Sequence, residues 1–151
     1  MRGPPLLRAW RPARLHARLH ALVCALLCAP AVAQTASPCG AELPGAQRVE
    51  SARYVLAWRA DPQKIPLGRH FAIDMVACAR PGAPAATGIT VDATMPAHGH
   101  GMNYKPSIKA TGDNRWRAEG LMFHMPGQWE LAFDVRGADK PERATQAVTV
   151  R

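Results

Sequence analysis

The chain has 151 residues, enough for one domain with a hydrophobic core of ordinary size. Its formal net charge of +8 is concentrated at the start, because without the five arginines of residues 1–33 Lys plus Arg falls from 19 to 14 while Asp plus Glu stays at 11. The remaining +3 is interspersed with acidic residues, which excludes the basic stripe of a nucleic-acid-binding protein and a polybasic membrane patch. We therefore predict neither nucleic acid nor a membrane surface as a partner.

Residues 1–33 have the pattern of a secretory signal peptide that is removed on export. Arginines supply a positive start, residues 19–28 are mostly apolar, and Ala31-Val32-Ala33 is a small-residue cleavage motif. The apolar run is too short to span a bilayer comfortably, so an uncleaved anchor is the less favoured alternative. A lipoprotein is also disfavoured, because Leu27 precedes Cys28 where a small residue is expected. We predict a periplasmic or secreted protein with no membrane span in the mature chain.

Two of the four cysteines leave with the signal peptide, and Cys39 and Cys78 remain. An even pair in an exported chain most simply forms a disulfide, because that compartment is oxidising. The bridge would join residues 34–48, a small, polar, Pro- and Gly-rich segment that we predict to be a flexible leader, to a strand. Two thiolates holding a metal ion are the less favoured alternative, since the sequence has no close Cys-x-x-Cys spacing after the signal.

Residues 49–151 have the pattern of a single β-domain. Short runs of alternating apolar and polar residues are separated by turn residues, and no window holds a 3.6-residue apolar stripe long enough for a helix. We predict an all-β, immunoglobulin-like antiparallel β-sandwich of about seven strands. The predicted strands lie around residues 54–58, 71–77, 89–95, 107–110, 115–123, 128–135 and 144–150.

The residues best suited to chemistry are crowded between positions 95 and 125, which hold three of the four histidines and four of the five methionines that follow residue 33. The first segment is Met95-Pro-Ala-His98-Gly-His100-Gly-Met102. Its glycines permit backbone conformations closed to other residues, so we predict a loop at one end of the sandwich. In an extended stretch, the spacing of two places His98, His100 and Met102 on one side.

The second segment is Met122-Phe-His124-Met125. In a strand that runs through residue 124, the large apolar Leu121 and Phe123 should face the core. Met122 and His124 would then point outward together. If this strand end and the loop lie at the same end of the sandwich, their donor side chains converge.

Five residues are therefore the candidate metal ligands. Met95 and Met125 are set aside as core residues, because each precedes a proline on an apolar face. Thioethers select Cu(I), whereas zinc sites favour Cys, His and carboxylate, and residues 95–104 contain no Asp or Glu. We predict copper, preferably Cu(I), as the cofactor. The five candidates are His98, His100, Met102, Met122 and His124.

The two segments resemble a known family. Met95-Pro-Ala-His-Gly-His-Gly-Met-Asn-Tyr104 and Gly120-Leu-Met-Phe-His-Met-Pro-Gly-Gln-Trp129 are similar to the YtkA-like domain, which is related in pattern to FixH-like proteins. The resemblance covers about residues 50–150. It implies a small exported β-sandwich, often associated with metal handling or respiratory-oxidase assembly, without a settled activity. FixH-like members are membrane anchored, so a role in oxidase assembly is not carried over to a chain predicted to be cleaved.

Two functions fit these observations. The first is a periplasmic metal-binding accessory domain that holds or delivers copper. The alternative is a non-metal interaction module that docks on a membrane or envelope complex, with the His-Gly-His-Gly-Met loop serving as architecture. Both imply an unknown protein partner in the envelope. We expect no enzyme, because Ser51 and Ser107 lie in no nucleophile motif and no phosphate-binding glycine loop is present.

Overall fold

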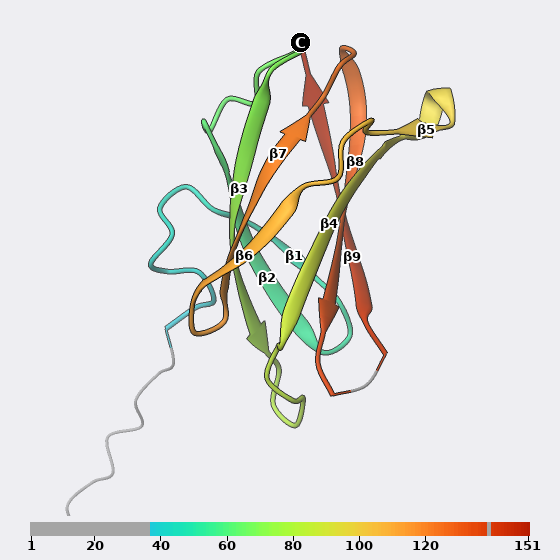
Figure 1. Cartoon of the computed structure of the whole chain (residues 1–151). Helices are drawn as coiled ribbons and strands as arrows, with labels where there is room; N and C mark the ends of the chain where they lie inside the picture. The colour runs from blue at the N-terminus through green and yellow to red at the C-terminus, as the bar shows by residue number, and fades with distance from the viewer. Residues whose placement is uncertain (1–36, 139) are drawn as a thin grey trace, which may run out of the picture. The chain divides into compact units, whose positions relative to one another are not determined.

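The computed structural model describes residues 37–138 and 140–151, and the predicted signal peptide lies outside them. Nine strands and one short 3-10 turn make up the regular structure of the described residues (Figure 1). They are β1 (Gln47–Glu50), β2 (Tyr54–Asp61), β3 (His70–Ala79), β4 (Gly88–Met95), η1 (Pro96–His98), β5 (His100–Gly101), β6 (Ser107–Gly112), β7 (Arg115–Met122), β8 (Gly127–Arg136) and β9 (Glu142–Val150).

The strands form two sheets with the order β1-β2-β3-β7-β6 and β5-β4-β8-β9. All pairs of neighbouring strands are antiparallel. The order β2-β3-β7-β6 against β4-β8-β9 matches strands ABED and CFG of an immunoglobulin constant-type domain. The all-β, immunoglobulin-like prediction is confirmed. The count is nine rather than about seven because β1 and β5 have only four and two residues, too few for an alternating pattern.

Alternation of apolar and polar residues explains how the two sheets close on one core. Along β4 the side chains at 89, 91, 93 and 95 are buried while those at 90, 92 and 94 are exposed. On β8 the buried set is Trp129, Leu131, Phe133 and Val135. Because the side-chain period of a strand is two, a slip of one residue would expose each set, so burial fixes the register.

The segment before β1 is attached more firmly than the predicted leader. Cys39 and Cys78 form the expected disulfide, with their Cα atoms 5.9 Å apart, and it joins this segment to β3. Leu43 is also buried and packs with Ala57 and Val76 in a small cluster separate from the main core. We expected Cys39 to be the only attachment. One leucine between small and polar residues is too weak a periodic signal to predict that second anchor.

One end of the sandwich gathers the loops of interest. Figure 1 shows the loop from β2 to β3, the β4–β5 region and the turn from β7 to β8 at the end where the chain reaches its C-terminus. A backbone bridge between Leu67 and Phe123 joins two of these loops. Within the described part of the chain, no helix is long and apolar enough to cross a membrane.

Candidate metal centre

The segment after β4 turns sharply back on itself. Pro96–His98 form one 3-10 turn, Gly99 ends it in the left-handed conformation at φ 66°, and His100 pairs with Met95 as the start of β5. Proline has a fixed φ suited to the start of such a turn, and glycine tolerates the left-handed end. The predicted loop is therefore present, but the extended arrangement of His98 and His100 is wrong.

The second segment leaves the strand before it reaches His124. β7 ends at Met122, and Phe123 contributes only the single bridge to Leu67. Met122 lies opposite His70 in the β3–β7 ladder. The ring of His124 instead turns toward β5 and β8, where it contacts His100 and Trp129. Burial still alternates here, since Leu121 and Phe123 are buried while Met122 and His124 are half-buried, and the shared direction of Met122 and His124 stays a prediction.

Three of the five candidate ligands lie next to one another. The ring centroids of His98 and His100 are 5.8 Å apart, and those of His100 and His124 are 5.3 Å apart. We call these three residues the histidine row. His98 is exposed, whereas His100 and His124 are half-buried. The row therefore runs from solvent toward the core.

The inner end of the row contains an unsatisfied polar atom. Nδ1 of His124 is buried and has no hydrogen-bond partner. The nearby indole of Trp129 does not supply one, because its Nε1 donates to the carbonyl of Met125 at 3.0 Å. That indole stands nearly perpendicular to the His124 ring, with centroids 5.4 Å apart. An unpaired buried polar group costs about 1 to 3 kcal/mol, so this nitrogen calls for an explanation.

The methionines surround the row to different depths. Met95 is buried in the core, as predicted, and Met125 is half-buried and packs against the same core. Met102 is also half-buried against the core, at the end of β5. Met122 is half-buried, two residues from His124 along the chain. Within residues 37–138 and 140–151, no group of three or more His, Cys, Asp or Glu side chains is arranged to hold a metal ion.

Two carboxylates elsewhere on the sheets, Glu119 and Asp134, are engaged in ion pairs. Hydrogen bonds from Lys109, then from Arg117, hold the pKa of Glu119 below its usual range. Hydrogen bonds from Arg143 do the same for Asp134, against the opposing effect of desolvation. These two groups are fixed in the ionised state, which suits structural ion pairs rather than proton transfer.

Two aromatic neighbours of this end escaped the sequence analysis. Trp129 contacts both His100 and His124, with ring centroids at 6.1 and 5.4 Å. Tyr104 packs edge-on against His70 at 5.1 Å. Alternation along residues 128–135 signals that Trp129 is a core residue, but no local pattern reveals which loop residues lie against it.

Comparisons with known proteins add little to this site. No protein-family model matches the chain, and no curated protein matches it. Among solved structures, a DUF4426 family protein from Pseudomonas aeruginosa PAO1 is similar over 72% of this chain and 98% of its own, with 10% sequence identity and a TM-score of 0.47.

Proposed function

We propose that this protein is a periplasmic copper-binding accessory domain that holds Cu(I), or passes it on, through the histidine row and a neighbouring methionine. The observation that carries the proposal is the buried, unpartnered Nδ1 of His124, whose ring lies 5.3 Å from that of His100. A metal ion bound to this nitrogen would offset the cost of its desolvation. The resemblance to the YtkA-like family implies metal handling and supports the same role.

The spacing of the imidazoles suits a shared ion. Because imidazole nitrogen binds metal at about 2 Å, two rings on one ion at trigonal or tetrahedral angles have centroids roughly 5 to 5.5 Å apart. The separation of His100 and His124 lies in this range, and that of His98 and His100 is slightly larger. Small ring movements would therefore let either pair share an ion.

The proposed ligand set combines two imidazoles with one thioether. Met102 and Met122 are the candidate sulfur ligands, since each lies two residues along the chain from a histidine of the row. Such a set favours Cu(I), because thioether sulfur is a soft ligand that zinc sites rarely use. Sulfur from methionine also stays available in an oxidising compartment, where cysteine would be lost to disulfides.

The surroundings of the row suit transfer of copper between proteins. Leu67 and Tyr104 are exposed by 40% and 45%, the large hydrophobic residues exposed in the described part of the chain. Leu67 pairs with Phe123, and Tyr104 packs on His70, which lies opposite Met122. These two exposed apolar side chains, next to Phe123 and His70, suit docking of an envelope protein that gives or receives copper.

The test is a Cu(I) titration of the purified protein under reducing conditions, in competition with a chromophoric Cu(I) chelator. We expect one Cu(I) per chain, and at least about a hundredfold weaker binding in a variant with His98, His100 and His124 changed to Ala. His70→Ala is the matched control, because this histidine is exposed and lies outside the row. Equal, weak binding by the native protein and the triple variant would refute the proposal.

Trp129 provides a second readout. Its indole lies within 6.1 Å of two rings of the row, so a bound copper ion should quench its fluorescence. The quenching should disappear in the triple histidine variant and in Trp129→Phe, while Trp58 and Trp116 continue to emit. Quenching that persists in Trp129→Phe would place the copper elsewhere.

The exposed Leu67 and Tyr104 also favour a second candidate, an interaction module in which the His-Gly-His-Gly-Met loop is structural. In that case Gly99→Ala should lower the melting temperature, because its φ of 66° strains any other residue. His98→Ala should leave the melting temperature unchanged. Copper should then have no effect on any of these variants, whereas a histidine-dependent rise with copper favours the first candidate.

A further inference from the structure

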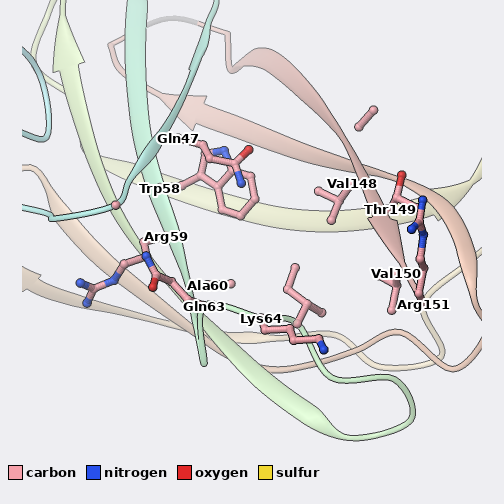
Figure 2. Close-up of a pocket in the computed structure, with 13 residues that line it drawn as sticks. Gln47, Trp58, Arg59, Ala60, Gln63, Lys64, Val148, Thr149, Val150 and Arg151 are labelled. Carbon is pink, nitrogen blue, oxygen red and sulfur yellow. The ribbon is translucent and has the colours of Figure 1, made fainter.

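A concave site is formed by residues other than those of the histidine row. It is a cleft of about 510 Å³ between β1 and β2 of one sheet and β9 of the other, and none of the five candidate metal ligands lines it. Figure 2 shows the indole of Trp58 on one side, with Val148 and Val150 across from it. The volume is in the range of small-molecule sites, and although most of the lining is polar, the apolar side chains of Trp58, Val148 and Val150 suit the body of an organic ligand.

The wall of this cleft contains an unsatisfied hydrogen-bond donor. Trp58 is 1% exposed, and its Nε1–H has no acceptor. Gln47, opposite Trp58 in the β1–β2 ladder, is exposed and lies beside the indole in Figure 2. A buried indole N–H usually has a partner, because leaving it unpaired costs free energy. An acceptor atom of a ligand that reaches this nitrogen would supply the missing hydrogen bond.

The charged side chains that line the cleft are all positive. Its lining includes Arg59, Lys64 and Arg151 but no Asp or Glu. Arg59 is committed elsewhere, since it pairs with Asp74 at 3.3 Å and points away from the cleft in Figure 2. Lys64 forms no ion pair within the described residues. The charged side chains of the lining therefore favour an anion, and Lys64, like Arg151, is available to pair with it.

We propose that this cleft binds a small amphipathic anion, with an apolar body against Trp58 and Val148 and an acidic group drawn toward Lys64 that accepts the indole N–H. The site is separate from the copper site, so the two proposals stand or fall independently. Carboxylates and sulfonates both meet the chemical requirement, because each combines negative charge with several acceptor oxygens.

The test uses two fluorescent probes that differ in one group. The anion 8-anilinonaphthalene-1-sulfonate and the neutral N-phenyl-1-naphthylamine share the same apolar body. Titrated into the purified protein, the anion should bind at least about tenfold more tightly than the neutral probe. The triple histidine variant should bind both probes as the native protein does, which separates this test from the copper test.

Two variants test the two polar contacts. Lys64→Gln should weaken binding of the anion about three- to tenfold and leave the neutral probe unchanged, with Lys140→Gln, an exposed lysine outside the cleft, as the control. Trp58→Phe keeps an apolar ring but removes the donor, and should weaken the anion by a similar factor. Equal affinity for the two probes, or anion binding that neither variant changes, would overturn the proposal.

Discussion

His124→Phe is the sharpest test of the site, because it should stabilise the metal-free protein while removing the proposed copper binding. The substitution deletes the buried, unpartnered Nδ1 and keeps a ring against His100 and Trp129. An apolar group in place of an unsatisfied polar one recovers about 1 to 3 kcal/mol. The larger phenyl ring offsets part of this, since overpacking costs on the order of 1 kcal/mol. We expect a net gain of about 1 kcal/mol, or roughly 4 °C in melting temperature.

The assay is urea and thermal unfolding with a copper chelator present, and again with Cu(I). His70→Phe is the control, because its ring is exposed and packs edge-on against Tyr104, so the change should alter stability by less than about 0.5 kcal/mol. With Cu(I) at a hundred times its dissociation constant, the native protein should gain about 2.7 kcal/mol. The variant lacks this ligand and should gain nothing. The variant should therefore be the more stable protein with chelator present, and the native protein the more stable one with Cu(I).

One result would refute the reasoning directly. If His124→Phe loses more than about 1 kcal/mol in the presence of chelator, Nδ1 is satisfied in the metal-free protein. The unsatisfied nitrogen would then no longer support the copper proposal. A variant that is stabilised without metal yet still gains stability from Cu(I) would keep the unsatisfied nitrogen but exclude His124 as a ligand.

The other predictions concern the scaffold. Changing Cys39 and Cys78 to Ser should lower the free energy of unfolding by about 3 to 4 kcal/mol, measured in urea without reductant, because the bridge closes a loop with a sequence separation of 39. Gly127→Ala should cost about 2 to 3 kcal/mol, because its φ is 129° and an added Cβ would lie 2.4 Å from Met95 Cε, whereas Gly88→Ala in open space should be nearly neutral. Hydrogen bonds from the Arg53 side chain, its backbone N–H and Ser51 keep the pKa of Glu142 below normal, so its contribution is present above the unfolded pKa and is lost as pH falls through the folded pKa. The difference in urea midpoint between native protein and Glu142→Gln should therefore shrink on acidification from pH 7, and a constant difference would contradict this account.

Much of the fold was predictable, because the core depends on local alternation. The runs at 54–58, 71–77, 89–95 and 128–135 each appear as strands in the structure, extended by a few residues. On β4 and β8 burial of every second residue is a property of the strand itself, so it is visible without knowing the partner strand, whereas β2 and β3 also bury Ala57 and Val76 against Leu43 on their other face. β1 and β5 were not predicted, since their pairing depends on neighbours that no local pattern identifies.

The candidate site was predictable in its residues but not in its geometry. The row of His98, His100 and His124 was among the expected ligands, yet the reasoning that grouped them assumed extended backbone. A proline and a left-handed glycine instead produce a 3-10 turn, and β7 ends before His124. Beyond the end of a strand, the alternation of side-chain directions no longer has to hold, because turn geometry and tertiary packing decide the direction of each side chain there.

The two unsatisfied ring nitrogens differ in the charge that would satisfy them. A neutral imidazole nitrogen without a proton offers a lone pair, so His124 Nδ1 suits a cation, whereas the indole of Trp58 is only a donor and suits an anion. Each lies where the core meets a concavity or a loop cluster rather than deep between the sheets. The sites share no residue, and free-energy changes at independent sites add. Copper and an amphipathic anion should therefore raise the melting temperature by the sum of their separate effects, and a clear departure from that sum would show that the sandwich core couples the two sites.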